Sequence, residues 1–462
     1  MFAIPGILGI LLFIYLRPQE AFAPLQGVPF LYLFFALILF GAAVDLRLRV
    51  TKAIPIPALP WAVAFLIWCL ITVAIMKPDQ LMPSAIQLFI TIAIFVLVAQ
   101  SIQSFQVFEK VAAMLIVLGM LLTLIAIHQS RAPLTCVIAP AGEGNHNETG
   151  TPTGIPCVKA RSCYIDAKDP SVDYYCERVG VLGTHSIGKR VRYRGVLQDP
   201  NELAIALTSG LALLIALWLR TRKRRWKWVA LTGVFLVAWA VKETGSRSGQ
   251  LGLLATLGAF LFWRYRWKLA VVAAPMMVPL LLLVAKGGSD RADAASSSTE
   301  RYEAWLAGME MFRQSPIWGI GFGQFNDHHF LTAHNTLILV FAELGIVGTF
   351  IFSMLVWIMI KTPILILKRY SGHEEARVSV IWSIALLASI GAILAGSAFL
   401  SFAYHYILWI FMGLAGGLFI SVRRHDPEFE VRISFIDAGV VLLFDIVMFF
   451  LLTVFLRLKG IS

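Results

Sequence analysis

The stretch HNTLILVFAELGIVGTFIFSMLVWIMI, residues 334–360, decides the fold class of this chain. It holds one acidic residue, Glu343, in an apolar run that is long enough to cross a bilayer as an α-helix. His334 and Asn335 stand at the start of the run. Polar residues at such places in a membrane helix are candidates for function or for contacts between helices.

Similar apolar runs recur along the whole sequence. Only 14% of the 462 residues are charged, against about 25% in soluble domains, and 58% are hydrophobic. The sequence therefore predicts an all-α polytopic integral membrane protein with about 12 transmembrane helices, or 13 if the last run also crosses. The runs lie at residues 2–16, 28–45, 59–76, 84–99, 109–128, 201–219, 228–242, 249–263, 269–285, 334–360, 378–397, 400–421 and 435–456.

The basic residues predict the orientation. They gather in short connectors such as 47–52, 220–228 and 361–377, which a cytoplasmic N-terminus places on the cytoplasmic side. The net charge of +12 is explained in this way, and no nucleic-acid partner is predicted. Two long segments with polar clusters then lie on the opposite side.

We expect six segments along the chain. They are helices 1–5 at 1–128, a cysteine-containing loop at 129–200, helices 6–9 at 201–285 with a short arginine loop at 243–248, a loop with an amphipathic helix at 286–333, helices 10–12 at 334–421, and a C-terminal tail at 422–462 that includes the last apolar run.

Four of the five cysteines fall in the loop 129–200, which is rich in Gly, Pro, Thr and Asn and is expected to be irregular. Thiols confined to one non-cytoplasmic loop predict two disulfides in an oxidising compartment, with three pairings open. Zinc is the alternative, but no C-x-x-C pair occurs, and no metal is predicted. The disulfide candidates are Cys136, Cys157, Cys163 and Cys176.

Three clusters of ionisable residues lie on the same side. In the first, RVRYRGVLQDPNELA (190–204), Asp199 and Pro200 suit the N-cap and first residue of a helix. Arg190, Arg192 and Arg194 come just before it, and arginines beside a helix N-terminus favour an anion. A solvated basic loop is the alternative.

The second cluster, VKETGSRSGQLG (241–252), joins two apolar runs in a loop of a few residues. Arg247 is therefore expected at the lipid–water boundary, where a guanidinium either extends to headgroups or binds a phosphate.

The third cluster spans 286–333. Ser297 and Glu300 have the spacing of a capping box, which predicts a helix with Arg301 near its start. A glycine-rich turn, GIGFGQF (319–325), follows, and His328 and His329 read as ordinary loop residues.

His334 is predicted to begin a span, where the helix dipole favours a neutral imidazole and hence a usable general base. An interfacial histidine bonded to its own loop is the alternative. At about 100° per residue, Glu343 lies on the opposite helix face and about 13 Å deeper. We interpret Glu343 as a hydrogen-bond anchor between spans.

Four of these stretches, in order, resemble one known family. HN followed by nine residues and GIVG (334–348), and the preceding arginine, tryptophan, proline and GIGFG (301–323), are similar to the signature of the O-antigen ligase and polymerase superfamily. RYRGVLQDPNELA (192–204) and TGSRSG (244–249) are similar to its arginine–glycine–DPN stretch and its arginine loop. The resemblance covers roughly 190–420.

The resemblance implies a GT-C-like membrane glycosyltransferase in the bacterial inner (cytoplasmic) membrane, with its active site facing the periplasm. Its donor would be a glycan on undecaprenyl diphosphate, and its acceptor lipid A–core, another glycan or a protein. It implies neither a metal nor another cofactor. It also implies catalytic roles for His334, as general base, and for Arg192 and Arg247, which would hold the diphosphate.

Further residues receive supporting roles. The substrate-binding candidates are Arg190, Arg194, Arg301 and Asn335, and the structural candidates are Asp199, Asn201 and Glu343. The cysteine-containing loop and the run after residue 435 depart from the family pattern, and either could specify an unusual acceptor.

A membrane transporter of an anion or a lipid-linked glycan is the alternative from another class, and a structural scaffold is a third. Transporters commonly have broken helices and charged groups at mid-membrane depth. In the interiors of the predicted spans, away from their ends, the only charged residues or histidines are Glu343, Asp445 and His405. The other ionisable residues cluster at one face, which favours chemistry over passage.

Overall fold

The structure is a computed structural model, which describes residues 1–138, 150–167, 172–265 and 291–459. The predicted span at 269–285 lies outside these residues. The chain forms two compact units, and each is described by itself. Unit 1 comprises Met1–Ile7, Leu37–Val111 and Ser289–Ser462, and unit 2 comprises Leu8–Ala36 and Ala112–Gly288.

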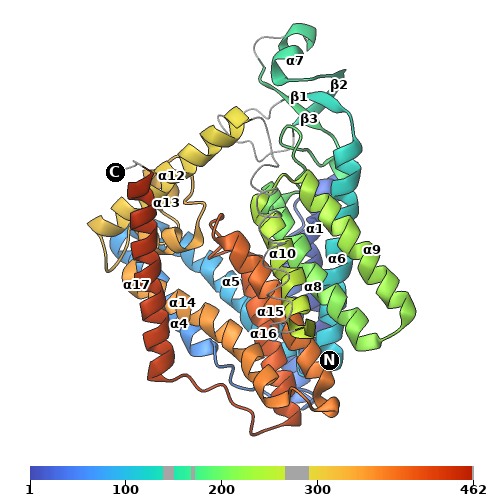
Figure 1. Ribbon diagram of the computed structural model, residues 1–462, viewed down its shortest axis with the longest axis vertical. Helices are drawn as coiled ribbons and strands as arrows, with labels where there is room; N and C mark the ends of the chain where they lie inside the picture. Colours follow the sequence, from blue (N-terminus) through green and yellow to red (C-terminus); the bar gives the residue numbers. More distant parts are fainter. Residues whose placement is uncertain (139–149, 168–171, 266–290, 460–462) are drawn as a thin grey trace. The chain divides into compact units, whose positions relative to one another are not determined.

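Helices dominate both units (Figure 1), which confirms the predicted all-α membrane fold. Their bounds are α1 Ile4–Leu16, α2 Pro18–Ala21, α3 Phe30–Arg47, α4 Leu59–Met76, α5 Leu81–Ser101, α6 Phe105–Arg131, α7 Ala160–Ala167, α8 Pro200–Thr221, α9 Arg224–Glu243, α10 Arg247–Tyr265, α12 Arg291–Gln314, α13 Phe325–His328, α14 Thr336–Tyr370, α15 Arg377–Ser397, α16 Tyr406–His425 and α17 Phe435–Leu458.

Among the described residues, nine helices are long and apolar enough to cross a membrane. They are α3, α4, α5, α6, α8, α14, α15, α16 and α17. The run at 2–16 forms the shorter apolar helix α1, and the runs at 228–242 and 249–263 form α9 and α10, which are not among the nine. The number of spans thus stays a prediction.

In unit 1, α14 packs against α4, α12, α15 and α17, and α5 packs against α16. Large apolar side chains such as Trp382, Trp409 and Phe65 are fully buried between these helices. The helix α17 joins the bundle through both polar and aromatic contacts: Ser353 donates to Asp445 Oδ1 at 2.7 Å, and Phe449 packs on Phe341.

Helix α14 is interrupted at Gly345, whose φ of 64° and ψ of −168° are open to glycine alone. The loop that follows α12 supplies hydrogen-bond partners for the backbone groups at this interruption. Ile320 N–H and Gly321 N–H donate to the carbonyls of Ala342 and Glu343, and Ile346 N–H donates to the carbonyl of Pro316. Trp68 Nε1 donates to the carbonyl of Leu344 at 2.9 Å. We call this contact between 316–321 and 342–346 the α14 joint.

Three predicted boundaries are wrong. The helix α12 begins at Arg291, so Ser297 is not its N-cap. The helix α16 begins at Tyr406 rather than at residue 400, and His405 is its N-cap, accepting from Ile407 N–H, instead of a group inside a span. His334 lies before α14, which begins at Thr336. Short loops between these helices are apolar, so a prediction from hydrophobicity alone places the helix starts too early.

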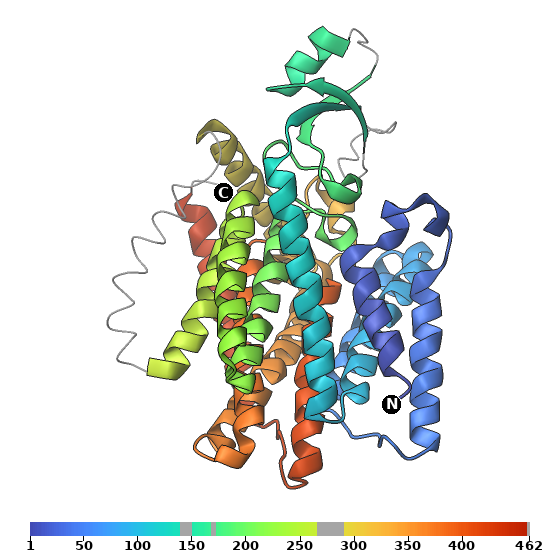
Figure 2. The same ribbon diagram turned by 90° about the vertical axis from the view of Figure 1, so that its right-hand side faces the viewer.

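In unit 2, α8 packs against both α9 and α10. The cysteine-containing loop is not irregular: beyond the end of α6 (Figure 2) it forms an antiparallel sheet of order β2-β1-β3. The strands are β1 Leu134–Ile138, β2 Thr151–Pro156 and β3 Tyr174–Arg178. Disulfides Cys136–Cys163 and Cys157–Cys176 close it, which confirms the predicted pair of bridges and selects one of the three pairings.

The α14 joint predicts a large effect of Gly345→Ala. A Cβ at this position would lie 2.2 Å from the carbonyl oxygen of Ile317, and its backbone conformation would be strained. We expect the variant to lose at least about 2 kcal/mol of stability, measured by thermal unfolding in detergent.

Gly119→Ala is the matched control, because Gly119 lies in α6 and, apart from its own helix turn, no atom of the described residues lies within 4 Å of an added Cβ. It should be neutral or stabilising by up to about 1 kcal/mol. Equal thermal unfolding of the two variants would contradict the role given to the joint.

Candidate active site

The first arginine cluster surrounds the start of α8. Asp199 is the N-cap, as the sequence predicts, and accepts from Asn201 N–H at 2.6 Å. Arg190 donates from Nε to the carbonyl of Thr244 at 2.9 Å and from Nη2 to Asn201 Oδ1 at 3.5 Å. The structure therefore brings Arg190, Asn201 and the short loop before α10 together.

Arg247 is the first residue of α10 and is exposed. Ser246, just before it, accepts from Gly249 N–H at 2.9 Å and so satisfies one free backbone donor of the first turn. The Arg247 guanidinium makes no hydrogen bond or ion pair with any residue that the structure describes. An exposed arginine at a helix N-terminus is well suited to hold an anion.

Arg192, in contrast, is only 6% exposed and makes several contacts with neighbouring residues. Its backbone N–H donates to Gln129 Oε1 at 3.0 Å, and its Nε donates to the carbonyl of His185 at 2.9 Å. Its Nη2 lies 3.7 Å from Glu177 Oε1, and His185 Nδ1 lies 3.8 Å from the other oxygen of Glu177. The result is a buried cluster of Glu177, His185 and Arg192.

Burial controls the pKa values of this cluster. It raises the pKa of Glu177 to about 7, although the charge of Arg192 opposes the shift. It lowers the pKa of His185 to about 4, and the positive charges of Arg192 and Arg194 add to that effect. Near neutral pH, His185 is therefore neutral, and Arg192 supplies the positive charge of the cluster.

Arg194 is also buried, and its Nη2 donates to the carbonyl of Leu182. Its Nε and Nη1 have no hydrogen-bond partner within the described part of the chain. Gly195, with φ of 57°, leaves room for Arg17, since a Cβ there would lie 2.2 Å from Arg17 Nε. The end of α1 thereby supports the arginine stretch, and Tyr193 OH donates to the carbonyl of Leu16 at 2.9 Å.

In unit 1, the residues around the start of α14 are tied to the loop between α15 and α16. His334 has a φ of 45°, and its backbone N–H donates to Ser401 Oγ at 3.1 Å. Asn335 is the N-cap of α14: its Oδ1 accepts from Ile338 N–H and its Nδ2 donates to the carbonyl of Ala398. A left-handed residue outside the helix does not follow the 100° rule, so helix geometry does not relate His334 to Glu343.

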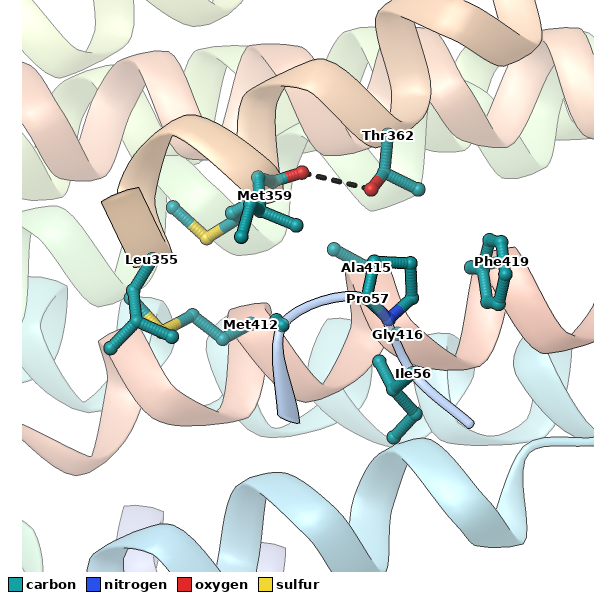
Figure 3. A pocket seen from close by; sticks show the side chains of 11 residues that line it. Ile56, Pro57, Leu355, Met359, Thr362, Met412, Ala415, Gly416 and Phe419 are labelled. Carbon is teal, nitrogen blue, oxygen red and sulfur yellow. Dashed lines mark hydrogen bonds between the residues drawn. The ribbon is translucent and has the colours of Figure 1, made fainter. Parts of the chain in front are cut away.

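A separate apolar cavity lies in unit 1, lined by side chains of α14 and α16 and the residues before α4 (Figure 3). Its single polar side chain, Thr362, donates to the carbonyl of Ile358 in its own helix. None of the predicted site residues lines this cavity, and we assign it no role.

Comparison with known families adds the decisive observation. Residues 232–353 match the family described as O-antigen ligase. This match confirms the resemblance to the O-antigen ligase and polymerase superfamily. No curated protein matches the chain.

The ligase match includes Arg247, Arg301, His334, Asn335 and Glu343, and it supports a membrane glycosyltransferase of the ligase type. Arg301 is half-buried on α12. Arg190, Arg192 and Arg194 lie before the matched range. The roles of all these residues in chemistry stay predictions.

Within the ligase match, Glu343 accepts hydrogen bonds from its surroundings. Its carboxylate accepts from Phe325 N–H at 3.1 Å, from Tyr404 OH at 2.8 Å and from the backbone of Gly323. It is 2% exposed. These contacts favour the anchoring role proposed from the sequence over a role in proton transfer to substrate.

Sequence reasoning missed Glu177, His185, Gln129 and Arg17. The available signal was an acid directly after Cys176, in a segment held by disulfides, with arginines further along the chain. Contacts between a strand, a loop and a helix end have no fixed spacing, so this signal did not identify the partner of Arg192.

The opposing pKa shifts predict how stability depends on pH. A carboxyl with a raised folded-state pKa stabilises the fold below its ordinary value of 4.5, and this contribution is lost as the pH rises to about 7. An imidazole with a lowered pKa stabilises the fold above its ordinary value of 6.5, and this contribution is lost as the pH falls to about 4. The two effects offset each other between 4.5 and 6.5.

Replacing one of these two side chains should leave the pH dependence contributed by the other unopposed. Relative to wild type, His185→Gln should lose stability and Glu177→Gln should gain it as the pH rises through this range, by up to about 1.4 kcal/mol per pH unit. Thermal unfolding between pH 4.5 and 7 measures both. Two variants whose pH profiles run parallel to wild type would contradict the assignment.

Glu343 gives a second prediction. Glu343→Ala leaves the N–H of Phe325 and the hydroxyl of Tyr404 without their acceptor, which should lower stability by roughly 2–6 kcal/mol. Glu343→Gln keeps an acceptor oxygen and should lose less. Thermal unfolding measures this order; an alanine variant with wild-type stability and no glycan transfer would instead indicate a catalytic role.

Proposed function

We propose that this protein is a glycosyltransferase that moves a glycan from undecaprenyl diphosphate to an acceptor on the periplasmic face of the bacterial inner membrane. The observation that carries the proposal is the ligase match at 232–353, which contains both Arg247 and His334. The acceptor is lipid A–core, a growing glycan or a protein.

The reaction has two demands. The acceptor hydroxyl must lose a proton as its oxygen attacks the anomeric carbon, and the bond between that carbon and the phosphate oxygen must break. His334 takes the proton as general base. Undecaprenyl diphosphate leaves with its negative charge, which Arg192 and Arg247 stabilise.

The arginines differ in a way that fits two tasks. Arg247 is exposed at a helix N-terminus and is suited to capture a phosphate. Arg192 is buried and fixed by several contacts, and a fixed cation stabilises a transition state without having to reorganise. Arg190, Arg194, Arg301 and Asn335 are proposed to position the substrates.

A transporter is the second candidate, because α14 is interrupted and interrupted helices are common in transporters. At Gly345, however, the carbonyls of Ala342, Glu343 and Leu344 accept from the protein itself. The interruption therefore has the contacts of a structural joint, and these carbonyls are already engaged rather than open to a transported ion.

Glycan transfer by the purified protein tests the proposal. Undecaprenyl-diphosphate-linked glycan is mixed with candidate acceptors in the presence of EDTA, and product is measured for wild type, His334→Ala, Arg192→Ala and Arg247→Ala. Loss of the base should lower the rate about 10²–10⁴-fold, and loss of an arginine about 10²–10³-fold.

His373→Ala and Arg161→Ala are the matched controls, because both side chains are exposed and lie outside the proposed site. Both should retain the wild-type rate. If wild type never consumes the donor, or if the three site variants match it, the proposal fails, and uptake of the donor into vesicles would then support the transporter.

A further inference from the structure

The strand β3 carries three consecutive residues with distinct contacts. Cys176 is bonded to Cys157. Glu177 lies beside Arg192 and His185. Arg178 donates through Nη1 to the carbonyls of Ser130 and Ala132 at the end of α6. One short strand therefore links the disulfide-closed sheet, the arginine stretch and a long helix.

The position of Glu177 is fixed by the sheet. Cys176 pairs with Cys136 across β1 and β3, and both cysteines also form disulfides, to Cys157 and Cys163. Arg178 N–H donates to Ser186 Oγ at 2.7 Å, and Ser186 N–H donates back to the carbonyl of Arg178. The segment that carries His185 is thereby tied to β3 as well.

Arg192 is held from three sides. The carboxylate of Glu177 faces Nη2, the carbonyl of His185 accepts from Nε, and Gln129 of α6 accepts from the backbone N–H. Glu177 is 7% exposed and Arg192 6%. Of these three partners Glu177 is the acid, and Asp199 adds a second negative charge that acts on Arg192. A buried guanidinium needs such counter-charge.

We propose that Glu177 is a positioning residue for Arg192: its carboxylate orients the guanidinium toward the departing diphosphate, and the disulfide-closed sheet holds that carboxylate in place. This inference rests on the proposed function. It gives the cysteine-containing segment a role in donor chemistry, in addition to any contact with acceptor. A purely structural ion pair, with no effect on transfer, is the competing view.

A double-mutant cycle separates the two views. Glycan transfer from undecaprenyl-diphosphate-linked glycan is measured as kcat/KM for wild type, Glu177→Gln, Arg192→Gln and the double variant, with thermal unfolding followed for each. Misplacement of a catalytic group by about 1 Å can reduce the rate roughly 100-fold. Glu177→Gln should therefore lower kcat/KM about 10- to 100-fold, and Glu177→Asp should restore part of the loss.

If Glu177 acts through Arg192, the double variant should be no worse than Arg192→Gln. Losses that multiply in the double variant overturn the inference, as does a Glu177→Gln protein with wild-type kcat/KM. A wild type that does not consume the donor rejects the proposed function instead, so the two failures are distinguishable.

Removal of the Cys157–Cys176 disulfide provides an independent test. Replacing Cys157 and Cys176 by serine should lower kcat/KM in the wild-type background but not further in Glu177→Gln, because the bridge acts by holding that carboxylate. Cys69→Ser is the matched control, since Cys69 is a buried free thiol of α4 in unit 1. If the double serine variant does not fold, the Glu177–Arg192 cycle still decides. A folded serine variant with full activity overturns the role of the sheet.

Discussion

Backbone groups that leave a helix within an apolar region must find partners in the protein itself, and α14 meets this requirement at Gly345. The carbonyls freed there accept from Ile320, Gly321 and Trp68, and the N–H of Ile346 donates to Pro316. Three backbone hydrogen bonds thus join the loop 316–321 to the helix.

This pairing has consequences along unit 1. Because Glu343 accepts from Phe325 and Tyr404, the loop after the joint and the residues before α16 are bonded to the same helix. At the start of α14, Asn335 and the backbone of His334 are bonded to Ala398 and Ser401. The proposed base therefore projects from a backbone that is bonded on several sides, as a preorganised catalytic group requires.

Buried polar groups find their partners through long-range contacts, and these contacts limited what could be predicted from the sequence. Apolar runs predicted helices well, since length and hydrophobicity are local properties, and the aspartate–proline pair placed the start of α8 correctly. The predicted helix starts at His334 and at residue 400 were wrong, because short apolar loops packed between helices have the composition of spans. The partner of Arg192 was not predictable, because it comes from a strand whose position depends on two disulfides.

The matched range 232–353 contains residues with proposed catalytic roles and also glycines with a structural role. A Cβ at Gly319 would lie 2.3 Å from the backbone of Glu343, and one at Gly345 would meet the carbonyl of Ile317. These glycines are thus explained by the joint, whereas Arg247 is exposed and is proposed to contact the diphosphate. Arg192 lies outside the matched range, and its partner Glu177 comes from the disulfide-closed sheet. The proposed diphosphate contacts therefore come from one residue inside the matched range, Arg247, and from one outside it, Arg192.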